Sequence, residues 1–243
     1  MGEFRREQGI SRPSAKTVVF YLLASLLLVS LTEPVSADDK AKDEETLGNA
    51  ATVLQAMLDD KSVPASLLAK SDCVIILPSV KKGAFIVGGI GGRGPMICRG
   101  GKNFSGRWAA PAMFSIGGAS IGMQVGGTAR DFVLLVMSQR AVDKVLEGKT
   151  KLGSDMAVAA GSGATSTGAV GGADILSYGR VSGLFAGTSL SGASLSSDDD
   201  ANGRLYGTAI SARDVVLGGK VKATAGGQRL VSMLNSKVPK HTD

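Results

Sequence analysis

Apolar and polar positions alternate through the middle of the chain in the pattern of a half-buried β-strand. From Ala119 to Gly126 the sequence reads Ala-Ser-Ile-Gly-Met-Gln-Val-Gly, so apolar side chains would face one side and small or polar ones the other. The stretch 132–137, FVLLVM, is apolar at every position, which is typical of a central strand with both faces covered. Residues 139–147 then follow a helical pattern that Gly148 ends.

The rest of the chain is predicted to continue this arrangement in short elements. Further strands are expected at 73–77, 84–87, 96–99, 108–111, 113–127, 155–160 and 175–181, with turns at 81–83 and 100–103. Helices are expected at 47–58, 201–206, 211–217 and 228–234, while the charged residues 38–45 are expected to be loose. The pattern therefore predicts a single α+β domain, a curved or barrel-like antiparallel β-sheet flanked by α-helices.

The first 37 residues have the parts of a secretory signal peptide. Four bases precede an uncharged apolar run at 18–31, which is too short to span a bilayer comfortably. Small residues at 35–37 then suit a signal peptidase. We therefore expect cleavage after Ala37, export to the periplasm or the cell exterior, and a mature domain of residues 38–243 at or near a membrane. An uncleaved N-terminal anchor is the alternative.

The composition narrows the choice of fold and partner. Glycine contributes 34 residues, about twice its usual share, which fits a tightly packed sheet of small side chains. Aromatic residues make up only 5%, which is poor for base stacking, so we expect no nucleic-acid partner. The net charge of +6 favours anionic partners without specifying them.

Two cysteines, Cys73 and Cys98, remain after the predicted cleavage. Export permits a disulfide between them, and both lie at the ends of predicted strands. The alternative is two separate buried thiols. The sequence leaves both open, because it does not supply the Cα–Cα distance that decides the matter.

Two glycine motifs match enzyme signatures only in part. The motif G-x-G-x-x-G at 89–94 has dinucleotide-binding spacing, but Pro95 follows where a helix N-terminus should meet the pyrophosphate. The motif G-x-S-x-G at 118–122 would make Ser120 a nucleophile, but the only histidine is His241 in the C-terminal tail. We therefore expect a glycine-rich turn at 89–94, no enzyme activity, no cofactor and no metal site.

The motif D-x-D-x-N-G at 198–203 copies the first half of a calcium loop. Ala209 stands at the twelfth position, where such a loop needs a bidentate glutamate. We expect a tight turn in which an aspartate caps the following helix, with calcium binding as the alternative.

The stretch 73–130 holds seven Lys and Arg residues and no Asp or Glu. Bases grouped with aromatic residues suit an anionic headgroup at a bilayer interface, and glycine-rich strands would let backbone N–H groups approach it. A solvated rim that keeps the protein soluble is the alternative. The candidate lipid-binding residues are Lys81, Lys82, Arg93, Arg99, Lys102, Arg107 and Trp108.

Several short sequence blocks resemble the SYLF domain family. They follow one another in the order found in that family, and together they cover nearly all of the predicted mature chain. They are ILPS with KGAF (76–85), W-x-x-P (108–111), GG-x-S-x-G with Q-x-G (117–126), D-x-VLLVM (131–137), LSY (176–178), GLFAG (183–187), and DDDAN with YG (198–207).

The resemblance implies a lipid-binding domain with a β-barrel-like sheet and flanking helices. Eukaryotic members bind phosphoinositides and related anionic lipids, some bind actin filaments, and bacterial members are usually exported. In eukaryotic members an N-terminal amphipathic helix aids membrane contact, whereas the matching helix at 43–59 is acidic here.

Residues and resemblance together predict a non-enzymatic exported protein without a cofactor. It would bind anionic phospholipid headgroups or a membrane surface through its basic, glycine-rich sheet. The alternative is an envelope module that is structural or binds a protein partner and has no lipid specificity.

Overall fold

The computed structural model describes residues 35–84, 88–120, 126–148, 150–152, 157–158, 174–180, 190, 192–207, 209–238 and 241. Its main compact unit spans Asp39–Asp243. The apolar run at 18–31 lies outside the described residues, as do 85–87, 121–125 and most of 155–160, where strands were predicted.

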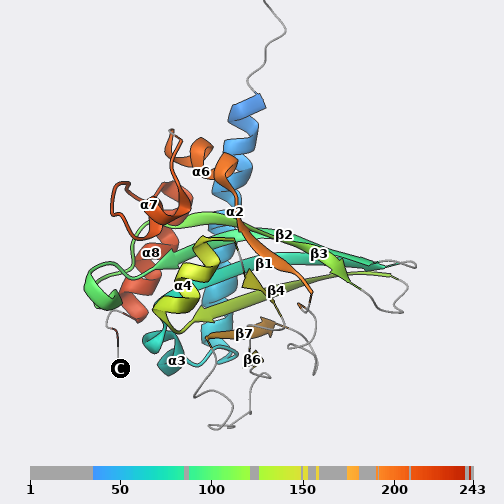
Figure 1. Ribbon diagram of the computed structural model, residues 1–243, viewed down its shortest axis with the longest axis horizontal. Coiled ribbons are helices and arrows are strands. Elements are labelled where there is room, and N and C mark those ends of the chain that lie inside the picture. The colour runs from blue at the N-terminus through green and yellow to red at the C-terminus, as the bar shows by residue number, and fades with distance from the viewer. Residues whose placement is uncertain are drawn as a thin grey trace, which may run out of the picture. The chain divides into compact units, whose positions relative to one another are not determined.

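An antiparallel sheet forms the centre of this unit (Figure 1). Its order is β5-β8-β3-β2-β1-β4-β7-β6, and among the described strands only the short edge strand β6 runs parallel to its neighbour, β7. The sheet is curled, and the predicted single α+β domain is confirmed. The strands are β1 (Cys73–Ala84), β2 (Gly88–Cys98), β3 (Ala112–Ser120), β4 (Gly126–Val136), β5 (Thr150–Lys151), β6 (Ala157–Val158), β7 (Ile175–Arg180) and β8 (Ser194–Ser197).

Helices cover both faces of the sheet. Figure 1 shows the long helix α2 passing behind the sheet and α4 lying in front of it. Among the described residues, no helix is both long and apolar enough to cross a membrane. The helices are α2 (Val35–Asp59), α3 (Ala65–Lys70), the 3-10 turn η2 (Lys102–Phe104), α4 (Gln139–Leu146), α6 (Asp199–Tyr206), α7 (Ala212–Val216) and α8 (Ala225–Lys237).

The alternation of side chains along β1 creates two hydrophobic cores. Ile75 and Leu77 join the core beneath α4 and α7, whereas Val74 and Ile76 join the core beneath α2, α3 and α8. All four are completely buried. Each contributes roughly 1.5–3 kcal/mol relative to an exposed side chain, so this strand holds the two layers of helices together.

Strand β1 is longer than predicted. We expected a strand end at Pro78 and a turn at 81–83, but β1 continues to Ala84. Its register with β4 shifts between Leu77 and Val80, where Ser79 has φ 51° and donates its N–H to Asp131 Oδ1 at 2.9 Å. Proline lacks an N–H for the ladder, and a local bulge accommodates it without ending the strand.

Two other local predictions were wrong. The glycine motif at 89–94 lies within β2 and is not a turn, because β3 pairs with all of it and β1 pairs with residues 89–91. The charged residues 38–45 are not loose, because α2 begins at Val35 and includes them. In contrast, five predicted elements are present. They are α4 (predicted at 139–147), β7 (175–181), α6 (201–206), α7 (211–217) and α8 (228–234).

Cys73 and Cys98 form a disulfide between β1 and β2. The two residues are direct partners in the ladder, and their Cα atoms are 4.0 Å apart. Both are completely buried, so the bridge lies inside the core.

Gly94 is predicted to tolerate no side chain, because a Cβ atom there would overlap the Ile76 carbonyl oxygen. We expect Gly94→Ala to lower the free energy of unfolding by about 2 kcal/mol, as measured by urea denaturation. Gly117→Ala is the control, because no described atom lies within 4 Å of its Cβ position. Equal stability of the two variants would contradict the packing described here.

Candidate functional site

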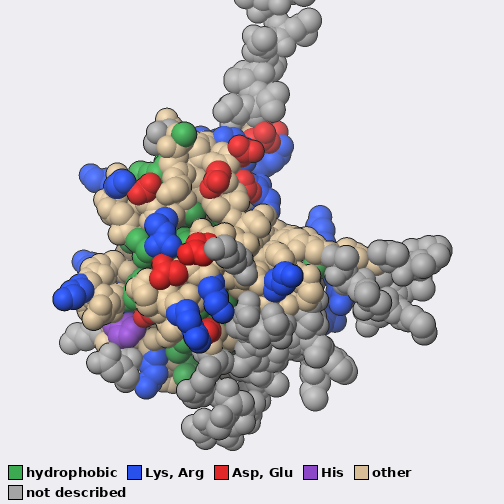
Figure 2. All heavy atoms as spheres, in the orientation of Figure 1, with side chains coloured by type: hydrophobic (Ala, Val, Ile, Leu, Met, Phe, Trp, Pro, Cys, Tyr) green, Lys and Arg blue, Asp and Glu red, His purple; other side chains and the backbone are tan. Residues whose placement is uncertain are grey.

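The structure does not bring the seven predicted lipid-binding residues together. Lys81 and Lys82 are neighbours in β1 and therefore point to opposite faces of the sheet. Lys82 pairs with Ile90, which belongs to the core beneath α4, whereas Lys81 lies on the face that carries α2. Figure 2 shows Lys and Arg side chains spread over one side of the protein and interleaved with Asp and Glu. The predicted single basic face is therefore wrong.

Arg99 and Trp108 are buried and cannot reach a headgroup on the surface. The Arg99 guanidinium carbon lies 4.2 Å from the centroid of the Trp108 ring, which is a cation–π contact. Both side chains donate to the Val238 carbonyl at 3.0 Å. Burial lowers the pKa of Arg99, and the charge of Asp72 only partly offsets this. Arg99 and Trp108 therefore anchor the end of α8, and they do not belong to the candidate site.

Lys102 and Arg107 are exposed but lie far from Lys81. They belong to the loop after β2, whereas Lys81 pairs with Gly91 near the start of that strand. The intervening strand is about 20 Å long, so one headgroup cannot contact both ends.

Arg93 is held by two carboxylates. Its Nη2 donates to Asp43 Oδ1 at 2.8 Å, and its Nε donates to Asp198 Oδ2 at 2.7 Å. Asp43 is fully buried and also accepts from Arg204 Nε at 2.8 Å. Burial by itself lowers the pKa of Arg93, but the hydrogen bonds and charges of Asp198 and Asp43 outweigh burial and raise it. These four residues, here called the ionic network, connect α2, β2 and α6.

Asp198 has a second role at the start of α6. Its Oδ1 accepts from the Ala201 N–H at 3.1 Å, so the predicted helix cap is confirmed. Among the described residues, no group of His, Cys, Asp and Glu is arranged to hold a metal ion.

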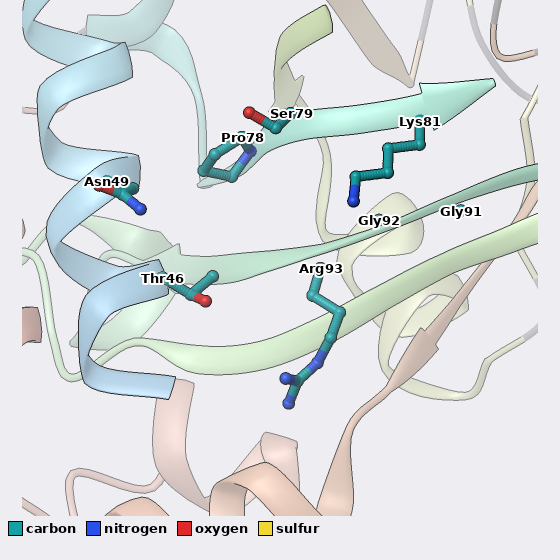
Figure 3. A pocket seen from close by; sticks show the side chains of 8 residues that line it. All are labelled: Thr46, Asn49, Pro78, Ser79, Lys81, Gly91, Gly92 and Arg93. Carbon is teal, nitrogen blue, oxygen red and sulfur yellow. The ribbon is translucent and has the colours of Figure 1, made fainter. Parts of the chain in front are cut away.

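A cavity of about 520 Å³ lies between α2 and the sheet, next to the ionic network (Figure 3). It forms where the pairing of β1 with β2 is interrupted, between Ile75 and Lys81. Gly91, which pairs with Lys81 and shares its face of the sheet, leaves this part of the floor without a side chain. The lining residues are Thr46, Asn49, Pro78, Ser79, Lys81, Gly91, Gly92 and Arg93.

Within the described sheet, the backbone of β2 has no β1 partner at this interruption. Elsewhere β2 pairs with β1 on one side and β3 on the other, so its glycine N–H groups are used in the two ladders. Backbone N–H groups that already pair in the two ladders are not available to a ligand, which limits the expected approach to the interruption. At Gly92 and Arg93 the pairing with β1 is absent, and the cavity lies over these residues.

Lys81 is the cation of this cavity that no carboxylate neutralises. In the described part of the chain its ammonium has no ion-pair or hydrogen-bond partner, and Figure 3 shows it extending over β2 toward Gly92. Asn49 and Ser79 offer an amide and a hydroxyl nearby, whereas the Thr46 hydroxyl already donates to the Lys42 carbonyl at 2.8 Å. A lysine with neutral donors around an open space suits a small anion.

Comparison with known proteins identifies relatives of this chain by sequence. The family model Ysc84, described as "Las17-binding protein actin regulator", matches residues 117–237. SH3 domain-containing protein PJ696.02 of Schizosaccharomyces pombe is 34% identical over 183 residues, which are 72% of this chain and 41% of that protein. LAS seventeen-binding protein 3 of Saccharomyces cerevisiae is 30% identical over 185 residues, 73% of this chain and 39% of that protein.

A human relative also matches this chain over only part of its own length. SH3 domain-containing YSC84-like protein 1 of Homo sapiens is 34% identical over 164 residues, which are 65% of this chain and 47% of that protein. The chain therefore spans less than half the length of each of these three relatives. No solved structure matches it.

Removal of the buried carboxylate should destabilise the protein. We expect Asp43→Ala to lower the free energy of unfolding by about 3 kcal/mol, because Arg93 and Arg204 lose their shared partner in a partly buried setting. Urea denaturation measures the change. Glu45→Ala is the control, an exposed acid of the same helix that should change stability by about 0.5 kcal/mol or less. Similar losses in both variants would contradict the role of the ionic network.

Proposed function

Because this chain belongs to the Ysc84 (SYLF) family, we propose that it is a non-enzymatic module that binds the phosphate of an anionic phospholipid in the cavity beside Lys81. One observation carries the proposal: a lysine without a carboxylate partner among the described residues extends over a space that side chains leave open. The description of the family model as an actin regulator also supports a binding function.

The size and charge of the cavity suit a phosphate with part of its glycerol. Its volume of about 520 Å³ lies within the usual range of small-molecule sites, roughly 300–1,000 Å³. A lysine–phosphate contact is a charge-assisted hydrogen bond, which is about twice as strong as a neutral one. Because Arg93 is already paired with two carboxylates, Lys81 supplies the main attraction.

We also propose that the chain is exported and cleaved after Ala37. The main compact unit begins at Asp39, so cleavage would leave the sheet and the ionic network intact. The disulfide between Cys73 and Cys98 supports export, because such bridges persist mainly in oxidising compartments. The bound membrane would then lie outside the cytoplasm.

A protein-binding module is the second candidate. The name of LAS seventeen-binding protein 3 and the description of the family model favour it, since both refer to a protein partner. Under this proposal the wild-type protein would be indifferent to anionic vesicles and would form a stable complex with a protein.

Export is tested on the protein recovered from its native cells. N-terminal sequencing should give Asp38 as the first residue. A mature protein that begins at Met1 would contradict cleavage.

Lipid binding is tested with vesicles of phosphatidylcholine, with and without phosphatidic acid. We expect Lys81→Glu to weaken sedimentation with phosphatidic acid vesicles at least about tenfold, because it replaces attraction by repulsion at the phosphate. Lys102→Glu makes the same change of charge on the exposed loop after β2. This control should stay within about threefold of the wild type in moderate salt, since screening weakens distant charges.

The two variants separate a site from a general charge effect. Equal losses in Lys81→Glu and Lys102→Glu would refute the cavity as the site. No sedimentation of the wild type with phosphatidic acid would refute the lipid proposal and favour the protein-binding module.

A further inference from the structure

The ionic network borders the proposed phosphate cavity, and Arg93 belongs to both. Its side chain starts in the cavity wall on the same sheet face as Lys81, because Lys81 pairs with Gly91 and Arg93 lies two positions further along β2. Figure 3 shows its guanidinium pointing away from Lys81, and it is there that Asp43 and Asp198 accept from it. Arg93 is therefore a second cation beside the cavity, but its charge is already paired with the two carboxylates.

We infer that Asp198 is a built-in competitor of the ligand, which holds Arg93 until the phosphate of an anionic lipid takes its place. This inference rests on the proposed function, because it concerns the same cavity. In the bound state the phosphate would contact both Lys81 and Arg93, while Asp198 would keep its cap on α6 and its Oδ2 would face solvent instead of Arg93.

The two carboxylates differ in how firmly they are held. Asp43 is fully buried and accepts from both Arg93 and Arg204, so its release would leave a charge inside the protein. Asp198 retains 17% of its side-chain exposure, and Arg93 is the base to which it hydrogen-bonds. Asp198 is therefore the partner that can exchange.

The exchange does not require α6 to unfold. Asp198 caps α6 through Oδ1 and contacts Arg93 through Oδ2, so the two roles belong to different oxygen atoms. A guanidinium also has five N–H donors in a planar fork that matches a phosphate, and the two carboxylates use one donor each. Arg93 can thus keep Asp43 while it accepts a new anion.

Competition of this kind lowers the apparent affinity of the wild-type protein. A ligand that needs Arg93 sees only the fraction of molecules in which Arg93 is released from Asp198. Removal of the Asp198 charge should therefore strengthen binding, which is opposite to the effect expected if Asp198 only supported the fold.

The test is Asp198→Asn in the phosphatidic acid vesicle assay. Asparagine caps helices as well as aspartate does, so α6 should keep its cap while Arg93 loses one charged partner. We expect the affinity to rise about two- to fivefold, the range of a partly exposed ion pair. Thermal denaturation confirms that the variant is folded.

Asp174→Asn is the matched control. It removes the same charge from an aspartate that accepts from Ser138 and Arg140 and does not line the cavity. Its affinity should stay close to that of the wild type. Glycerol phosphate in solution, used as a second probe, should also bind more tightly to Asp198→Asn if the site recognises phosphate without a membrane.

The outcomes separate this inference from the proposed function. A gain in Asp198→Asn that exceeds the gain in Asp174→Asn and disappears when Lys81→Glu is added supports the competitor. If wild-type binding depends on Lys81 but Asp198→Asn behaves like Asp174→Asn, the competitor is refuted and the lipid site stands. If neither the wild type nor Asp198→Asn binds the vesicles, both proposals are refuted.

Discussion

The contact of the buried Asp43 carboxylate with Arg93 and Arg204 determines how α2, β2 and α6 are arranged around the cavity. A carboxylate without solvent is costly unless charged donors surround it, and here two guanidinium groups do so. This requirement holds α2 against β2 and α6 against both. The same contact sets the direction of Arg93, and hence the distribution of positive charge near the cavity.

The cavity follows from two local features of the sheet that α2 then encloses. Pro78 and Ser79 interrupt the pairing of β1 with β2, and Gly91 leaves no side chain over the gap. Helix α2 lies across this place and contributes Thr46 and Asn49. A backbone irregularity, a glycine floor and a helix fixed by an ion pair together produce an open space beside Lys81, which has no carboxylate partner in the described part of the chain.

The family relationship and the structure together describe a domain with a compact core. The three relatives are more than twice as long as the region that matches this chain. Within this unit the charge-bearing residues divide into two groups. Arg93, Arg99 and Arg204 serve internal contacts, whereas Lys81, Lys102 and Arg107 remain on the surface.

The sequence by itself determined the class of fold, the main helices and strands, the helix cap at Asp198 and the family. These depend on periodicity and on short motifs, which act between residues close in the chain. Only the tertiary structure decided which Lys and Arg side chains are exposed and unpaired, and which are held in internal contacts. Arg93 meets Asp43 and Asp198 across 50 and 105 positions, and Arg99 meets Val238 across 139. Burial and charge pairing over such separations arise from packing, and no local pattern encodes them.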